Sequence, residues 1–380
     1  MMITKTYDLQ NAMQTTFLDE LLSRIAAKLQ ITKTQKEEAE TRYLSIGEWL
    51  EKEDCLLAAA HPQIYSQGSF RIGTTVKPKR YDEYDIDLVC ELQLDYKQCD
   101  PMKLLDVVYK RIKEHGTYGP MAERKNRCIR INYANEFHMD ILPGLPDYEK
   151  GNASLKVPDR TQHSWKASNP KGYARWFDSK KEILPIKIYE EKIEPLPIER
   201  RKYPLQIIVQ LLKRQRDIAF SDKSDDLRPI SIVLTTLAAH NYYGQLSVAN
   251  GLDLILTKVS DSIPDYGRLI VRNPTNAEED LSEKWDDNPK AYLQFVDWIQ
   301  ELKKKWAQLI NLTPPDVYID LKKMFGENVT NDVIREFSDD TNKSRISETI
   351  GVAGPFATLK FGNSRSSKSI PKNTFFGAQF

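Results

Sequence analysis

Three carboxylates in this sequence of 380 residues have the type and spacing that suit metal-ion chemistry. Asp85 and Asp87 stand one residue apart, and Asp140 lies in the apolar run at 137–142. Because side chains alternate along a β-strand, Asp85 and Asp87 are expected on one face of a sheet while their neighbours enter the core. Two carboxylates held this close repel each other unless a cation lies between them. The pattern therefore predicts a site for Mg²⁺, with Mn²⁺ as a possible substitute.

Asp140 completes this site if its strand pairs with the strand that carries Asp85 and Asp87. Three carboxylates would then converge on one sheet face and hold two Mg²⁺ ions. In such a site one ion lowers the pKa of an attacking hydroxyl, and the other stabilises a triphosphate and its leaving pyrophosphate. The alternative interpretation is a solvent-facing strand with two polar positions, because an isolated D-x-D is frequent by chance.

A glycine and a serine, Gly68 and Ser69, stand 16 residues before Asp85 and could bind the triphosphate. Glycine lets the backbone approach a phosphate closely, and a serine at the start of a helix offers its hydroxyl and N–H. Residues 68–75 also match half of a P-loop, but Thr74 stands where that motif requires lysine and no apolar strand precedes it. A turn without a ligand is the alternative. The D-x-D pair that follows favours a phosphate-binding turn.

The elements that must position these residues begin with two helices and a sheet. Helical spacing over about residues 18–57 predicts two helices, with Thr32 or Thr34 as the N-cap of the second. Alternating and apolar runs predict an α+β sheet lobe. Its strands are expected at 84–94, 128–133 and 137–142, with a helix at 101–115 and a short helix near 172–180.

A second, helical lobe is predicted after residue 203 from long amphipathic stretches that have proline near their starts. Its helices are expected at 204–220, 229–243, 291–312 and 315–337. From residue 354 the sequence is rich in Ser, Lys, Asn and Gly without periodicity. The predicted divisions are N-terminal helices that belong to the sheet lobe at 1–60, a core with the metal site at 61–200, a helical lobe at 201–350 and a flexible tail at 351–380.

Composition bounds the substrate and the compartment. The net charge of +1 gives no field that would attract a long polyanion, which favours a small substrate. The four cysteines form no C-x-x-C pair, and Cys90 lies in an apolar run typical of a core thiol. The N-terminus has no secretory pattern, and no run reaches 18 apolar residues. We therefore expect a cytoplasmic protein with no membrane segment.

The motifs together resemble a known family. Their order is similar to that of nucleotidyltransferases of the DNA polymerase β type. More narrowly, the sequence resembles the bacterial cGAS/DncV-like nucleotidyltransferases (CD-NTases). The resemblance lies in the helical lobe and in four motifs: YSQGSFRIGTTV at 65–76, YDIDLV at 84–89, MDILPG at 139–144 and SNPKGY at 168–173. The resemblance covers about residues 1–340. It implies a polymerase-β-like sheet lobe with long N-terminal helices, packed on a C-terminal helical lobe.

By this resemblance the chain joins nucleoside triphosphates, ATP and/or GTP, into a cyclic di- or trinucleotide and releases pyrophosphate. The product would be read by a separate effector protein in anti-phage (CBASS) defence. The resemblance implies that three aspartates bind the metal ions and are catalytic: Asp85, Asp87 and Asp140. It also implies that the turn before them contacts the triphosphate through Gln67, Gly68 and Ser69.

The resemblance also implies a lysine and a serine on the donor phosphates, best matched by Lys213 and Ser231. Lys213 follows an apolar helix face and is a compact charge. Ser231 falls in the first turn of a helix, where N–H groups are unpaired. The alternative is that Lys213, with Arg214 and Arg216, forms only a solvated basic face.

Other partners and functions remain alternatives. The basic cluster of Arg124, Lys125, Arg127 and Arg130 is interpreted as an exposed strand edge, so no nucleic-acid activator is expected. The terminus at 375–380 could join a conjugation partner or an operon-encoded regulator, or be a mobile end. The same site could instead transfer a nucleotide to a protein, a tRNA end or a small molecule. A non-enzymatic scaffold fits poorly with three repelling carboxylates. Base identity and linkage stay open.

Overall fold

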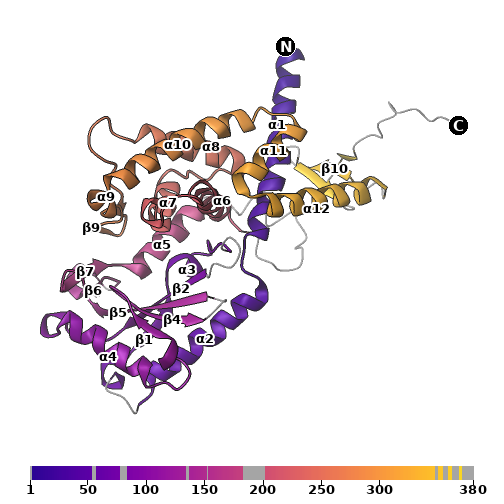
Figure 1. Cartoon of the computed structure of the whole chain (residues 1–380). Coiled ribbons are helices and arrows are strands. Elements are labelled where there is room, and N and C mark those ends of the chain that lie inside the picture. Colours follow the sequence, from indigo (N-terminus) through magenta and orange to yellow (C-terminus); the bar gives the residue numbers. More distant parts are fainter. Residues whose placement is uncertain are drawn as a thin grey trace.

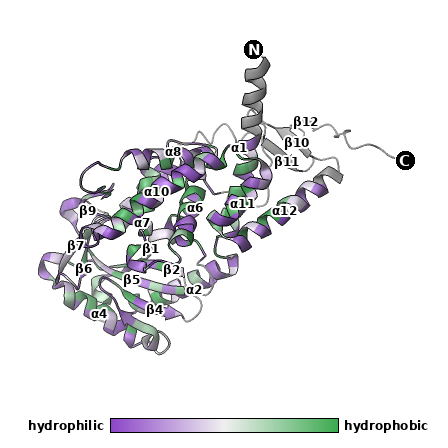
Figure 2. Ribbon diagram, turned by 45° about the horizontal axis from the view of Figure 1, so that its top comes forward, coloured by the Kyte–Doolittle hydropathy of each residue, from purple (hydrophilic) through white to green (hydrophobic). Residues whose placement is uncertain are grey.

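The computed structural model describes residues 2–53, 57–77, 84–133, 137–151, 153–182, 202–346, 350–353, 358–361 and 368–369. It has two lobes, one built on a sheet and one built of helices, stacked one on the other (Figure 1). Each lobe has its own large cluster of buried apolar side chains. Polar and apolar residues are interspersed along the helices of both lobes (Figure 2).

A seven-stranded sheet organises the first lobe. Its strands are β1 (Gln63–Ser66), β2 (Tyr84–Glu91), β3 (Ala122–Arg124), β4 (Ile129–Tyr133), β5 (Phe137–Pro146), β6 (Leu155–Asp159) and β7 (Ser164–Ser168). The order is β1-β2-β5-β4-β3, and β6 continues from β5 and pairs with β7. Only the pair β2–β5 is parallel among these described strands. The predicted α+β class and the three predicted strands are confirmed.

Helices α2 (Lys33–Glu51) and α4 (Pro101–Lys113) lie against the sheet on the side away from the helical lobe (Figure 1). Ile86 and Leu88 of β2 are fully buried in the same cluster as Val108 of α4. This packing leaves the other face of β2 turned toward the helical lobe, where a cavity separates the two lobes.

Local sequence explains where these helices begin. Thr32 caps α2 in a capping box, in which its side chain accepts from the Gln35 N–H and the Gln35 side chain accepts from the Thr32 N–H. Of the two predicted N-caps, Thr32 is therefore the one used. Asp100 caps α4 through the N–H groups of Met102 and Lys103, with a proline at the first helical position.

The helical lobe is built around helix α6 (Pro204–Ala219), which is largely buried. Its helices are α5 (Pro170–Lys181), α6 (Pro204–Ala219), α7 (Ser231–His240), α8 (Val248–Asp261), α9 (Lys284–Asp287), α10 (Pro289–Leu309), α11 (Pro314–Phe325) and α12 (Glu327–Ile346), with a hairpin of β8 (Arg272–Asn273) and β9 (Asn276–Asp280). The core joins Leu211 of α6, Leu252 of α8, Phe295 and Trp306 of α10, and Phe325 of α11. Helix α6 lines the cavity with Lys213, Arg216 and Asp217.

One predicted helix needs correction, and one long helix is additional to those predicted. The helix predicted at 315–337 is two helices, because Gly326 takes a left-handed backbone (φ +99) and ends α11 before α12 begins. Helix α8 was not predicted from the sequence.

The first helix does not pack as predicted. Helix α1 (Met2–Lys28) was assigned with α2 to the sheet lobe, but Leu18, Leu22 and Ile25 are buried in the core of the helical lobe. Asp19 on the same helix accepts hydrogen bonds from Ser247 and Ala249 at the start of α8. The apolar face of α1 thus extends the helical lobe, and α2 alone covers the sheet.

The C-terminal segment predicted as a flexible tail contains described strands. These are β10 (Ile350–Ala353), β11 (Thr358–Phe361) and β12 (Lys368–Ser369), which form an antiparallel sheet. The lack of periodicity in this segment therefore did not indicate the strands at these residues. The terminus at 375–380, for which docking to a partner and a mobile end were the two alternatives, lies outside the described residues.

Two further predictions concern compartment and thiols. No helix in the described part of the chain is long and apolar enough to cross a membrane. Cys90 is fully buried in the core of the sheet lobe, as predicted. Cys55 lies outside the described residues.

Candidate active site between the two lobes

The parallel pairing of β2 and β5 brings the three predicted carboxylates together. Asp87 lies directly opposite Asp140, and Asp85 lies opposite His138. The predicted alternation is present, because Ile86 is fully buried while the Asp85 side chain keeps 54% of its surface exposed. All three carboxylates line the cavity between the lobes.

The three carboxylates lie close enough to repel one another electrostatically. Burial, followed by repulsion from Asp140 and Asp85, raises the pKa of Asp87 to about 7. Burial in the cleft also raises the pKa of Asp85, although the Arg130 guanidinium opposes that shift. A cation bound among these oxygens would relieve the repulsion.

Arg130 on β4 forms an ion pair with two of the carboxylates. Its Nε and Nη2 donate to the two oxygens of Asp140 at 2.7 Å each, and Nη2 also lies 3.3 Å from Asp85 Oδ1. The hydrogen bonds to Asp140 raise the pKa of Arg130. Asp87, Asp140 and Arg130 therefore form one row across β2, β5 and β4.

This position corrects the prediction that Arg130 belongs to an exposed strand edge. Strand β4, which carries Arg130, lies between β5 and β3 and is not an edge strand. Of the two arginines of the cluster that lie on strands, Arg124 is the one at the edge, because it is on β3. Burial of Ile129 and Ile131 places Arg130 on the face that carries Asp140. That alternation was visible in the sequence, but the pairing of β4 with β5 was not.

The predicted phosphate-binding turn leads from β1 into the short helix α3 (Gly68–Arg71). The Gln67 N–H donates to the carbonyl of Asp87 at 2.8 Å, so the turn is attached to the strand that carries the carboxylates. Gly68 takes φ +59, a left-handed conformation that favours glycine. The Ser69 and Thr75 hydroxyls lie 3.3 Å apart, and both residues line the cavity.

The carbonyls of the loop after the turn are held by the helical lobe. The four consecutive carbonyls of residues 72–75 each accept a hydrogen bond from a side chain on or next to α6. The pairs are Gln206 with Ile72 (2.8 Å), Lys202 with Gly73 (2.8 Å), Lys213 with Thr74 (3.1 Å) and Gln210 with Thr75 (2.7 Å). Helix α6 therefore fixes the backbone that follows Gly68 and Ser69.

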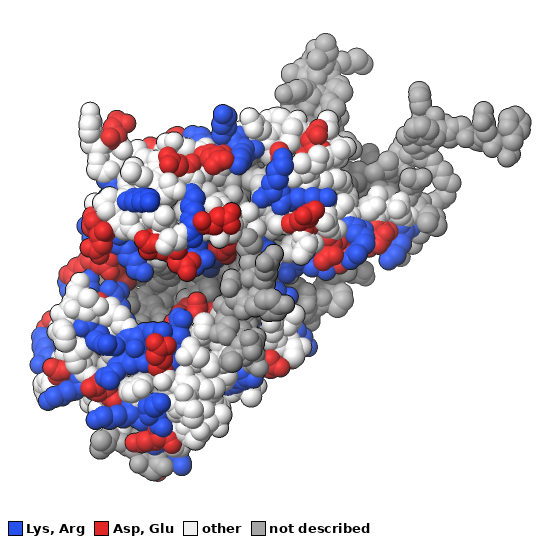
Figure 3. Space-filling model, in the orientation of Figure 1, with Lys and Arg blue, Asp and Glu red and all other residues white. Residues whose placement is uncertain are grey.

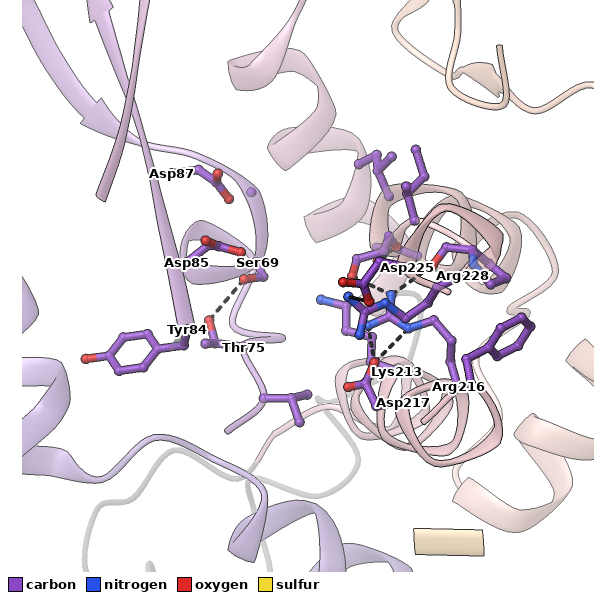
Figure 4. Close-up of a pocket in the computed structure, with 18 of the residues that line it drawn as sticks. Ser69, Thr75, Tyr84, Asp85, Asp87, Lys213, Arg216, Asp217, Asp225 and Arg228 are labelled. Carbon is purple, nitrogen blue, oxygen red and sulfur yellow. Dashed lines mark hydrogen bonds and ion pairs between the residues drawn. The ribbon is translucent and has the colours of Figure 1, made fainter. Parts of the chain in front are cut away.

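Lys213 and Ser231 lie on the cavity wall opposite the carboxylates. Burial, and then the charge of Arg216, lowers the pKa of Lys213 to about 7. Ser231 opens α7, and its Oγ accepts from Arg216 Nη1 at 2.9 Å. Figure 4 shows Asp85 and Asp87 on one side of the space, with Lys213 and Arg216 facing them from the other. Contact of these residues with phosphate remains a prediction, but the alternative of a solvated basic face is excluded by the burial of Lys213 (5% exposed).

The cavity has a volume of about 1070 Å³. The hollow is visible between the lobes in Figure 3. Its helical wall also carries acidic and basic residues that were not predicted from the sequence: Asp217, Asp222, Asp225 and Arg228. Asp217 pairs with Arg216, and Asp225 pairs with Arg228. No sequence signal set these residues apart from other loop and helix charges.

The donor set suits Mg²⁺ in its chemistry. Asp85, Asp87 and Asp140 supply hard carboxylate oxygens from two adjacent strands, and their repulsion leaves Asp87 in need of a counter-charge. In the described residues, however, no three acidic, histidine or cysteine side chains are already gathered as a ligand set. Arg130 occupies both oxygens of Asp140 in this arrangement.

Comparison with known proteins identifies the family to which this fold belongs. Residues 16–181 match the model of the Second Messenger Oligonucleotide or Dinucleotide Synthetase (SMODS) domain. A c-di-GMP synthase of Roseivirga ehrenbergii is 31% identical over 372 residues, which cover 95% of this chain and 98% of that protein.

Two solved structures share the fold. The CD-NTase CdnG of Bradyrhizobium diazoefficiens, in complex with GTP, superposes with a TM-score of 0.69 at 22% identity, covering 84% of this chain and 99% of that one. CdnC of E. coli MS115-1 with ATP superposes with a TM-score of 0.60 at 13% identity, covering 80% and 96%. The SMODS match and the relative that is 31% identical over almost the whole chain show that the chain belongs to the second messenger oligonucleotide or dinucleotide synthetases, the bacterial CD-NTases, and that it is a nucleotidyltransferase.

Proposed function

We propose that this nucleotidyltransferase joins two molecules of GTP into a cyclic dinucleotide at the site formed by Asp85, Asp87 and Asp140. The observation that carries the proposal is the register of β2 and β5, which sets Asp87 opposite Asp140 beside the turn at Gly68. The family makes cyclic oligonucleotides, and the choice of GTP rests on the c-di-GMP synthase that is 31% identical.

The reaction consists of two similar displacements. A ribose hydroxyl oxygen of one nucleotide attacks the α-phosphorus of the other, and the bond from that phosphorus to the β-phosphate oxygen breaks. Pyrophosphate leaves, and the hydroxyl proton passes to Asp140 or to solvent. The linear product then reacts in the same way within itself, which releases a second pyrophosphate and closes the ring.

The residues of this chain would bind and orient the donor. Gln67, Gly68 and Ser69 would contact the triphosphate from the sheet lobe, and Lys213 and Ser231 from the helical lobe. Two Mg²⁺ ions, held by Asp85, Asp87 and Asp140, would neutralise the phosphate charge and lower the pKa of the attacking hydroxyl. The buried ammonium of Lys213 is well suited to a phosphate, because its Nζ contacts only the carbonyl and hydroxyl of Thr74 among the contacts resolved here.

The size of the cavity supports two nucleotides. Its volume of about 1070 Å³ is at the upper end of the range for small-molecule sites. Its walls come from both lobes, so a donor on the carboxylates and an acceptor against the helical wall fit the same space. We further propose that the product is read by a separate effector protein.

Incubation of the protein with Mg²⁺ and GTP, ATP or both, followed by mass spectrometry, tests the proposal. The expected result is a phosphatase-resistant cyclic product from GTP alone, with two pyrophosphates released for each product. The combined variant D85N and D87N should form none, while D297N, an exposed aspartate on α10, serves as a matched control.

Other outcomes would redirect the assignment. A cyclic product that requires ATP would retain the enzyme class and correct the base. Pyrophosphate release only after addition of a protein, tRNA or small-molecule acceptor would replace cyclisation by transfer to that acceptor. If the combined variant D85N and D87N formed as much product as the wild type, these aspartates would not belong to the active site.

A further inference from the structure

Arg130 stands where a cation shared by two of the carboxylates would stand. Its Nη2 contacts oxygens of two separate residues, Asp140 Oδ2 at 2.7 Å and Asp85 Oδ1 at 3.3 Å. Its Nε contacts the remaining oxygen of Asp140 at 2.7 Å. The side chain is 24% exposed, against 54% for Asp85, so it lies within the site.

A guanidinium and a divalent ion cannot use these oxygens together. Mg²⁺ lies about 2.1 Å from each carboxylate oxygen that it binds, which is closer than any of the Arg130 contacts. An ion bridging Asp85 and Asp140 would therefore overlap the space of Nη2. It would also face a positive charge a few ångströms away, in a cleft where such repulsion is weakly screened.

The fold fixes Arg130 in this place and also offers it a second partner. In the antiparallel pair β4–β5 Arg130 is directly opposite Asp140, and in the pair β3–β4 it is directly opposite Glu123. Directly opposed residues project from the same face with their Cβ atoms about 5 Å apart. Glu123 now pairs with Lys125 and keeps 54% of its side chain exposed. A guanidinium released from Asp140 can therefore reach a carboxylate without leaving its strand.

We propose that Arg130 is a displaceable counter-ion, which holds oxygens of Asp85 and Asp140 in the nucleotide-free protein and would move toward Glu123 when a divalent ion takes those oxygens. The inference rests on the proposed metal role of Asp85 and Asp140. Its consequence is that this ion binds weakly until nucleotide brings further charge to the site. Arg130 is thus a positioning residue that controls when the carboxylates become ligands.

Titration of the nucleotide-free protein with Mn²⁺, followed by the electron paramagnetic resonance signal of the free ion, tests this directly. In R130M we expect Mn²⁺ affinity to rise at least about tenfold, because the competing charge is gone. R130K keeps the charge but loses the two-point contact with Asp140, so a smaller rise, about threefold, is expected. The matched control R124M removes a positive charge on β3 that pairs with Asp106, and it should bind Mn²⁺ as wild type does.

The remaining outcomes are also informative. If R130M binds Mn²⁺ no more tightly than wild type, Arg130 only supports Asp140 and the proposal is wrong. If Mn²⁺ affinity rose equally in R124M, the rise in R130M would be due to net charge alone, and the proposal would also be wrong. If R130M does not fold, R130K replaces it in this test, and Mn²⁺ affinity in R130K equal to that of the wild type would contradict the proposal. Loss of the gain in the double variant R130M and D140N would locate the ion. If the gain in R130M persists when D85N and D140N are added, these carboxylates do not bind the ion and the metal site itself is refuted.

Discussion

The Asp87 side chain leaves no room for a side chain at Gly68: a Cβ built on Gly68 would lie 2.2 Å from Asp87 Oδ2. The adjacent backbone is also joined, because the Gln67 N–H donates to the Asp87 carbonyl. The proposed phosphate-binding turn and the proposed metal ligand are therefore one packed unit. Any side chain at position 68 must displace the carboxylate.

G68A should abolish most of the activity while the protein still folds. The added methyl displaces Asp87 and strains a residue at φ +59, so we expect a loss of about 100-fold or more in product formation and about 1–2 kcal/mol in unfolding free energy. Product formation and urea unfolding measure the two effects. G116A, where a Cβ would meet nothing within 4 Å, is the matched control. Near-normal activity in G68A would disprove the close packing of the turn on Asp87.

Lys213 should make nucleotide binding depend on pH. Its pKa of about 7 in the free protein means that the ammonium is lost above neutrality, whereas a bound triphosphate would favour the charged form. The affinity for a non-hydrolysable GTP analogue should therefore fall between pH 7 and pH 9, by up to about tenfold for each pH unit. Isothermal titration calorimetry gives the affinities.

The variant K213M should lose this dependence and bind about tenfold or more weakly at pH 7. K223M, which removes an exposed lysine at the rim of the cavity, should retain the slope of the wild type. Parallel pH curves for wild type and K213M would show that Lys213 does not contact the phosphates.

Asp19 should make stability fall as pH rises. Burial raises its pKa from 3.8 to about 6, against the hydrogen bonds that it accepts at the start of α8. A raised folded pKa contributes stability that is complete below the unfolded value and is lost as pH rises through about 6. The wild type should thus lose about 1 kcal/mol of unfolding free energy between pH 5 and pH 7.5 relative to D19N.

Urea unfolding at both pH values measures this difference. The control E20Q removes a neighbouring carboxylate that pairs with Arg24 at the surface, and it should retain the fall seen in the wild type. An equal change with pH in D19N and wild type would mean that Asp19 is not buried against α8 in solution.

The sequence alone predicted which face of the sheet carries the three carboxylates, because that prediction depends on local geometry. The alternation of Asp85 with Ile86 and of Asp140 with Ile141 places the carboxylates on one face once their strands pair. The N-cap at Thr32 likewise depends on residues three positions apart.

Features that depend on which elements meet could not be predicted in the same way. An apolar face shows that α1 is buried, but not that its partners are α6, α8 and α12. Arg130 appeared as one of several basic residues, because nothing local to β4 tells which strand pairs with it. The break at Gly326 depends on a backbone conformation that a glycine permits but does not require.

The side-chain hydrogen bonds to the carbonyls of residues 72–75 have a consequence for how the molecule unfolds. These carbonyls belong to the sheet lobe by sequence, yet their donors lie on or beside α6. Loss of the helical lobe would leave them to water and free the backbone beside Gly68. The two architectural lobes thus share one cooperative unit at the site, and a sheet lobe produced alone would retain its carboxylates but not a defined place for the triphosphate.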